Sequence, residues 1–274
     1  MNRVNGVIMK AFDINLMPDY KAFGIEEEGL TPVLHCMIHD AIPDRTYPNV
    51  LVVPGGCYSF CSDREGEPVA SRFYSFGYNA YYLEYSVWRK PYPVDMTELC
   101  AAVAYIRSHS RELNATRDVT VCGFSAGGHM VAAYGLYHED FAAMGDVAPD
   151  RLILSYPVIT MGELTHGETR DNVAPTIELQ EKLSVEKHVT GKYAPTFLWA
   201  CADDATVPVE NSLMMAKALS AAKVPFELHI FPEGGHGLAL ADITTQKDGD
   251  PKYLCPHAAN WLPLALEWLD GMRK

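Results

Sequence analysis

Residues 119–137 read VTVCGFSAGGHMVAAYGLY, a short apolar run of strand type that leads directly into an apolar run of helix type. The turn between the two runs is G-x-S-x-G, with glycine at 123 and 127 and serine at 125. These glycines let strand and helix approach closely, so that the Ser125 hydroxyl stands clear of the sheet at a helix N-terminus, where developing negative charge is favoured. The pattern predicts that Ser125 is a nucleophile. The simpler alternative is a glycine-rich turn in which Ser125 only caps the helix.

A serine hydroxyl is a poor nucleophile at neutral pH, so a base must take its proton and an acid must orient that base. The predicted base is His236, which lies between two glycines in a loop directly after the strand-like run 226–231. The acid is Asp203 or Asp204, which both follow the strand-like run 195–201. Position alone leaves both open: one aspartate holds the histidine tautomer, and the other is a turn or helix-start carboxylate. The order serine, aspartate, histidine along the chain is that of α/β-hydrolases.

The segment PGGCY, residues 54–58, follows the strand-like run 50–53 and is predicted to bind an oxyanion. Small residues let backbone N–H groups point at a tetrahedral oxygen, and each such donor lowers the barrier by roughly 3 kcal/mol. We assign the donors to the amides of Cys57 and Ala126, with Gly56 as helper. The alternative is a plain Pro-Gly-Gly turn.

Two aromatic residues, Tyr58 and Trp88, follow predicted strand ends and are candidates for substrate binding. Aromatic rings there can stack on a sugar, and they can equally pack beneath a neighbouring segment. The sequence leaves both readings open.

Short apolar runs alternate with helical patterns over the whole chain. Such alternation predicts a mainly parallel sheet with helices on both faces, and a site at the carboxyl ends of the strands. The expected number of eight strands comes from the resemblance to α/β-hydrolases given below, because the runs of strand type number seven. The runs of strand type are 31–39, 50–53, 79–85, 119–123, 151–156, 195–201 and 226–231, and the helical patterns are 66–77, 95–113, 126–138, 209–222 and 257–272. Asp95 and Glu98 match a capping box at the start of the second helix. We predict one domain, residues 1–274, with a small cap inserted at about 161–192.

Composition narrows the class of protein. The 274 residues carry a net charge of −13, which argues against a nucleic-acid or anionic-membrane partner. The seven cysteines are scattered, without a C-x-x-C pair or zinc spacing, so we expect no metal site and a reducing compartment. The N-terminal residues show no leader pattern, and we expect a cytoplasmic protein. A homo-oligomer is possible, and the family resemblance given below implies a small-molecule acyl ester as the partner.

Six segments together resemble bacterial α/β-hydrolase esterases of the acetylxylan-esterase-like group, which is similar to the hormone-sensitive-lipase and dipeptidyl-peptidase catalytic domains. They occur in order from about residue 48 to the C-terminus: PGGCY, LEYSV, GFSAGGH, ADDATVPVENS, PFELHIFPEGGHGLAL and NWLPLALEWL. Members commonly have a glycine where this chain has Cys57. That change keeps the backbone donor, but the added side chain narrows the acyl side.

The resemblance implies an α/β-hydrolase fold with Ser125 as nucleophile and His236 as base. The family's acid lies three residues before the valine of a Val-Pro pair, which is Asp204, with Asp203 as the fallback. It further implies a serine carboxylesterase that removes short acyl groups, notably acetyl groups on plant-wall sugars such as xylan, without a cofactor.

Two other functions use the same segments. A serine peptidase of the dipeptidyl-peptidase type would keep the same three residues, but no acidic clamp for a substrate amine is obvious in this sequence. A non-catalytic binding protein on a hydrolase fold usually lacks one of the three residues, and none is missing here.

Overall fold

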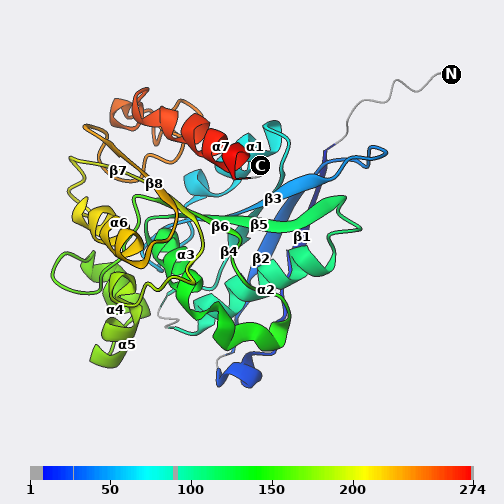
Figure 1. The fold of residues 1–274 in the computed structure, drawn as a ribbon, viewed down its shortest axis with the longest axis horizontal. Helices are drawn as coiled ribbons and strands as arrows, with labels where there is room; N and C mark the ends of the chain where they lie inside the picture. The colour runs from blue at the N-terminus through cyan, green and yellow to red at the C-terminus, as the bar shows by residue number, and fades with distance from the viewer. Residues whose placement is uncertain (1–8, 27, 89–91, 273–274) are drawn as a thin grey trace.

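A computed structural model describes residues 9–26, 28–88 and 92–272, and its centre is one twisted sheet (Figure 1). The strands are β1 (Lys10–Asn15), β2 (Val33–Ile38), β3 (Tyr47–Val53), β4 (Asn79–Glu84), β5 (Ala115–Phe124), β6 (Arg151–Ser155), β7 (Thr196–Cys201) and β8 (Phe226–Phe231). Their order is β1-β2-β4-β3-β5-β6-β7-β8. All neighbours from β4 to β8 are parallel, and only the pairs β1–β2 and β2–β4 are antiparallel. The predicted mainly parallel, eight-stranded sheet is confirmed.

The strand that the sequence pattern missed is β1. It pairs with β2 along its whole length, from Lys10 opposite Ile38 to Asn15 opposite Val33. It forms one edge of the sheet, and five of its six side chains are exposed. A strand exposed on both faces lacks the alternation of apolar and polar residues that reveals a half-buried strand.

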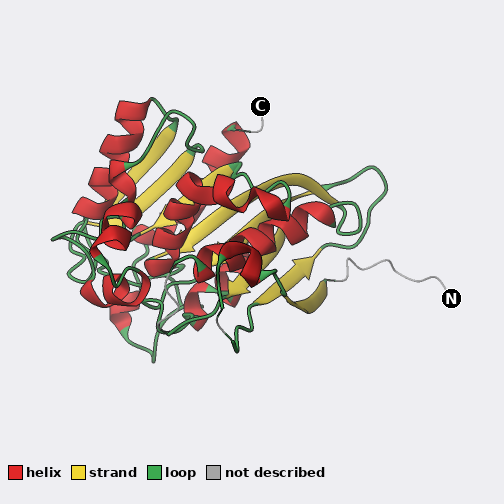
Figure 2. Cartoon of the chain, turned by 90° about the horizontal axis from the view of Figure 1, so that it is seen from below, coloured by secondary structure: helices red, strands yellow, loops and turns green. Residues whose placement is uncertain are grey.

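Helices cover both faces of the sheet (Figure 1, Figure 2). They are α1 (Glu67–Ser75), α2 (Val94–Ser108), α3 (Ala126–Tyr137), α4 (Gly167–Val173), α5 (Ile177–Leu183), α6 (Glu210–Ala222) and α7 (Trp261–Gly271). Side chains of α1 and α7 pack into one core, and side chains of α2, α3 and α6 pack into the other. The short helices α4 and α5 lie within the predicted insertion between β6 and β7, which we call the cap segment, residues 161–192.

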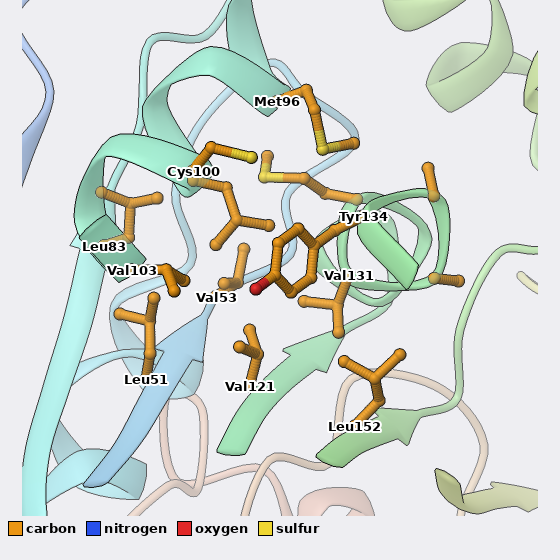
Figure 3. Packing of buried hydrophobic residues seen from close by; sticks show 14 of the residues in the cluster. Leu51, Val53, Leu83, Met96, Cys100, Val103, Val121, Val131, Tyr134 and Leu152 are labelled. Carbon is orange, nitrogen blue, oxygen red and sulfur yellow. The ribbon is translucent and has the colours of Figure 1, made fainter. Parts of the chain in front are cut away.

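The larger core holds the central strands against α2 and α3 (Figure 3). Leu51 and Val53 of β3 and Val121 of β5 meet Val103 of α2 and Tyr134 of α3 there, and all five side chains are buried. In α3, residues 126–135 are buried without exception, so this helix has no solvent face in its first three turns. Packing on every side fixes the position of the α3 N-terminus, and with it the position of Ser125.

The capping box predicted at Asp95 and Glu98 is wrong. Helix α2 already begins at Val94, so Asp95 lies in its first turn rather than at the cap position. The Glu98 carboxylate instead accepts hydrogen bonds from the Ser86 amide (2.7 Å) and the Tyr20 hydroxyl (2.8 Å). A carboxylate that is needed by two other segments is not available to its own helix terminus.

Asp95 makes the stability of the fold depend on pH. Burial raises the pKa of this carboxyl to about 7, so its stabilising contribution is complete below the ordinary pKa and is lost as the pH rises toward 7. Asp95→Asn cannot ionise, and its unfolding free energy relative to wild type should rise by about 2–3 kcal/mol between pH 5 and pH 8. Denaturant titrations at the two pH values measure this, with Glu112→Gln, an exposed carboxylate, as control. Equal differences at both pH values would contradict the prediction.

Candidate active site

The turn between β5 and α3 holds Ser125 in a strained conformation. Its φ is 52° and its ψ is −117°, in the left-handed region that side chains disfavour. A Cβ on Gly123 would lie 2.4 Å from the Gly127 carbonyl oxygen, and one on Gly127 would lie 2.3 Å from the Val53 carbonyl oxygen. Both glycines are therefore required by close backbone contacts, which is the physical reason for the G-x-S-x-G pattern. The Ser125 side chain makes no capping hydrogen bond to α3.

The structure brings Ser125, His236 and Asp204 together in one hydrogen-bonded row. Ser125 Oγ lies 2.8 Å from His236 Nε2, and His236 Nδ1 lies 2.7 Å from Asp204 Oδ2. Asp204 is 6% exposed, and its Oδ1 accepts hydrogen bonds from the amides of Thr206 and Val207, both at 2.9 Å. The Asp204 carboxylate accepts a hydrogen bond from Nδ1–H, so the imidazole keeps its proton on Nδ1 and Nε2 is left as an acceptor facing the serine hydroxyl.

The neighbouring aspartate has a different environment. Asp203 accepts hydrogen bonds from the amides of Gly234 (3.2 Å) and Gly235 (2.8 Å), directly before His236. It thus ties the turn after β7 to the loop after β8 and does not contact the imidazole. Adjacent residues on a strand end point in different directions, which separates two aspartates that look equivalent in the sequence.

The predicted oxyanion segment forms a tight turn after β3. Gly56 has a φ of 125°, and a Cβ on it would lie 2.0 Å from the Phe60 carbonyl oxygen, so glycine is required there. Within the described residues, the amides of Cys57 and Ala126 donate no hydrogen bond, and both can serve a ligand. Burial raises the pKa of the Cys57 thiol, so this side chain stays protonated and is a poor nucleophile.

The two aromatic candidates have different surroundings. Tyr58 is 1% exposed, its hydroxyl is hydrogen-bonded to His129 Nδ1 at 2.8 Å, and its ring packs edge-on against Tyr85. The expectation that Tyr58 binds substrate is therefore wrong, because the buried ring has no face free for stacking. Trp88 is 63% exposed, and its amide donates a hydrogen bond to the Tyr58 carbonyl at 2.6 Å. Trp88 thus presents its side chain to solvent from a backbone anchored beside the oxyanion segment.

The cap segment contributes residues that the sequence analysis did not single out. Asn172 donates hydrogen bonds to the Cys57 carbonyl and to Ser59 Oγ, both at 2.9 Å. His166 at the N-terminus of α4 is half-buried, and its pKa is lowered by burial and then by the nearby His236. These residues lie within an inserted segment rather than at strand ends. The strand-end rule therefore gave no signal for them.

Space for a ligand exists beside the imidazole. A cavity of about 510 Å³ is bordered by His236, Asp203, Lys252 and Tyr253. Over the described part of the chain, no group of three or more histidine, cysteine or acidic side chains could hold a metal ion. The described helices also include none with the length and apolar character needed to cross a membrane.

Comparisons with known proteins identify the family of this chain. The model of the prolyl oligopeptidase family matches residues 81–248. The chain is 36% identical over 230 residues to endo-1,4-beta-xylanase B of Butyrivibrio fibrisolvens, covering 78% of this chain and 36% of the relative. It is 25% identical to an acetylxylan esterase of Xylanibacter ruminicola, covering 92% of this chain and 50% of the relative. The chain thus spans half or less of the length of these two curated relatives.

A solved structure covers nearly the whole chain. It is an acetyl ester-xyloside bifunctional hydrolase from Caldicellulosiruptor lactoaceticus, with a TM-score of 0.84, 32% identity, and coverage of 98% of each chain. These similarities confirm the predicted resemblance to acetylxylan-esterase-like α/β-hydrolases.

Proposed function

Because the chain belongs to the prolyl oligopeptidase family of α/β-hydrolases, we propose that it is a serine carboxylesterase that removes acetyl groups from carbohydrate esters. The observation that carries the proposal is the row Ser125–His236–Asp204, with heavy-atom distances of 2.8 and 2.7 Å. The three side chains follow β5, β8 and β7, and therefore lie at the carboxyl ends of parallel strands. Nucleophile, base and orienting acid are then within hydrogen-bonding distance before substrate arrives.

The proposed reaction runs through an acyl-enzyme. His236 Nε2 takes the Ser125 proton as Oγ attacks the ester carbonyl carbon, and the carbonyl oxygen becomes an oxyanion held by the Cys57 and Ala126 amides. Asp204 stabilises the imidazolium. The imidazolium then gives its proton to the leaving alcohol as the carbon–oxygen bond breaks. Water, deprotonated by His236, attacks the acyl-serine, and the returning proton regenerates Ser125 and releases the acid.

Features of the site support a small acyl group and a sugar alcohol. Cys57 adds a side chain beside the proposed oxyanion donors, which leaves less room for the acyl chain. The exposed Trp88 offers a ring for a sugar face. Two of the similar proteins are named for the hydrolysis of acetyl esters, one as an acetylxylan esterase and the other as an acetyl ester-xyloside bifunctional hydrolase.

The proposal is tested by acetate release from acetylated xylo-oligosaccharides, measured beside p-nitrophenyl acetate and p-nitrophenyl butyrate. We expect release from the sugar and from the aryl acetate, and slower hydrolysis of the butyrate because of Cys57. Trp88→Ala should raise KM for the sugar about threefold to tenfold and leave the aryl acetate unchanged, since only the sugar stacks. Phe76→Ala is the control, because Phe76 is 55% exposed and lies where β4 begins, at the opposite end of the strand. Activity on aryl esters alone would remove the sugar from the proposal, and inactivity on all esters would overturn it.

A peptidase is the second candidate, because the family model that matches is named for an oligopeptidase. It would use the same three residues on an amide bond. Aminoacyl-nitroanilides separate the two functions: turnover of these amides at rates comparable to the acetyl esters would favour the peptidase.

A further inference from the structure

Glu65 is a buried carboxylate that lies at the junction of the loops carrying the proposed catalytic groups. It ends the short 3-10 helix Asp63–Glu65 after the oxyanion segment and is 3% exposed. None of the catalytic steps described above uses it. A buried carboxylate is costly unless all its oxygens are paired, so its partners indicate what it is kept for.

One oxygen of Glu65 holds the oxyanion segment. Oε2 accepts a hydrogen bond from the Gly55 amide at 2.9 Å. The backbone closes the same loop, because the Ser62 amide donates to the Gly55 carbonyl and the Glu65 amide donates to the Ser62 carbonyl, both at 3.0 Å. A Cβ on Gly55 would lie 2.8 Å from Oε2 and 2.9 Å from the Ser125 Cβ. The carboxylate therefore holds this loop directly against the nucleophile.

The other oxygen holds the histidine loop through a tyrosine. Oε1 accepts a hydrogen bond from the Tyr156 hydroxyl at 2.6 Å, and that hydroxyl accepts one from the Ala239 amide at 2.9 Å. The Tyr156 ring packs edge-on against the His236 ring, with 5.0 Å between centroids. The adjacent Arg64 donates to the Gly237 carbonyl at 2.8 Å. Two residues that follow His236 in the chain, Gly237 and Ala239, are thus held from the loop that follows β3.

We propose that Glu65, acting through Tyr156, is a positioning residue that sets the oxyanion donors and the His236 imidazole at a fixed separation. The inference rests on the proposed esterase function. The oxyanion donors and the imidazole must both reach oxygens that are bound to the same tetrahedral carbon. A misplacement of about 1 Å of one relative to the other can cost about a hundredfold in rate. A single carboxylate shared by both loops keeps their relative position constant.

The chemistry of the carboxylate explains why glutamine is not equivalent. A carboxylate accepts both the Gly55 N–H and the Tyr156 O–H, whereas an amide has one accepting oxygen and one donating nitrogen. In Glu65→Gln, the amide oxygen can accept the Gly55 N–H only if the amide NH₂ faces Tyr156. The Tyr156 hydroxyl still accepts the Ala239 N–H, but its own proton then has no acceptor. Tyr156→Phe removes that hydroxyl and leaves Glu65 bound to Gly55 alone.

The test is steady-state kinetics of Glu65→Gln and Tyr156→Phe with p-nitrophenyl acetate, at a temperature where circular dichroism shows each variant folded. We expect kcat to fall tenfold to a hundredfold in each, with KM within about twofold, because the acetyl group still binds but is misaligned. The double variant should lose less than the product of the two single losses, since Tyr156→Phe already removes the proton left unpaired by glutamine. Tyr134→Phe is the matched control: its buried hydroxyl makes a 2.6 Å bond to the Val147 carbonyl, within the α3 core.

The outcomes separate this inference from the proposed function. Loss of thermal stability like that of Tyr134→Phe, with unchanged kcat, would overturn the positioning role and leave the esterase intact. Multiplicative losses in the double variant would also overturn it, because the two residues would then act independently. If the wild-type protein hydrolyses no ester, the esterase itself has failed; Glu65 is then tested by fluorophosphonate labelling of Ser125, which the variants should slow at least tenfold.

Discussion

Replacing Ser125 by alanine should lower the hydrolysis of p-nitrophenyl acetate by at least about 10⁴-fold, to a level near the background reaction. In the proposed mechanism the Ser125 Oγ forms the bond to the acyl group, and His236 has no other hydroxyl as a hydrogen-bond partner within the described residues. Thermal stability should change by no more than about 3 °C. The side chain makes no capping bond to α3, so alanine loses only one hydrogen bond, worth about 1 kcal/mol.

The measurement combines steady-state rates, labelling by a fluorophosphonate probe and calorimetry. Ser108→Ala is the control, because this serine at the end of α2 bonds only locally, to the Tyr105 carbonyl and to the next side chain, His109. The control should keep both labelling and rate. Labelling that persists in Ser125→Ala would mean that another residue is the nucleophile, and the proposed mechanism would fail.

Asp204→Asn should lower kcat about 10³- to 10⁴-fold. Asp204 Oδ1 accepts two backbone amides and Oδ2 faces His236 Nδ1 at 2.7 Å. If the asparagine oxygen keeps the backbone amides, its NH₂ faces Nδ1 and forces the proton onto Nε2. That tautomer donates toward Ser125 instead of accepting its proton. If the asparagine turns the other way, its NH₂ meets two N–H donors, so the variant should also lose stability.

Asp203→Asn is the matched control for this prediction. One asparagine oxygen can still accept from the Gly235 amide, and only the longer bond to Gly234 is lost. We expect kcat to fall less than about tenfold, since the His236 tautomer is untouched. Rates of both variants, measured on the same ester and normalised to the labelled fraction of Ser125, decide between the two aspartates. The reverse ranking would make Asp203 the acid.

The Ser125 turn could be predicted from sequence because its glycines are required by backbone contacts that permit no side chain. Gly123 is required by contacts within its own strand–turn–helix unit, and Gly127 is required by the end of β3, which lies beside β5 in the sheet. The buried strands could also be predicted, because an apolar run indicates a buried strand whichever strands it pairs with. The edge strand β1 carries no such mark, since five of its six side chains are exposed and its place in the sheet is given by backbone pairing with β2.

Other features depend on residues far apart in the chain. Position after the strand does not distinguish the two carboxylates of Asp203 and Asp204, and only the family resemblance points to Asp204. The physical difference between them appears when the loop after β8 lies beside them, with His236 32 residues away from Asp204. Tyr58 looks like a site aromatic by position, yet the tertiary contact with His129, 71 residues away, buries it. Glu65 and Asn172 lie outside every strand-end motif, and their partners become visible only when the loops meet.

The sequence alone therefore predicts the fold class, the G-x-S-x-G turn and the positions of Ser125 and His236 after predicted strands. These features could be predicted because backbone conformation and burial restrict which residue types occur at a position. Three other features were decided by the tertiary structure, through the direction of side chains after packing. These are the carboxylate that faces the imidazole, the aromatic residue that remains exposed, and the buried groups that join the loops. Side-chain direction at a strand end is set by contacts across the sheet and cap, and apolar periodicity and composition do not encode it.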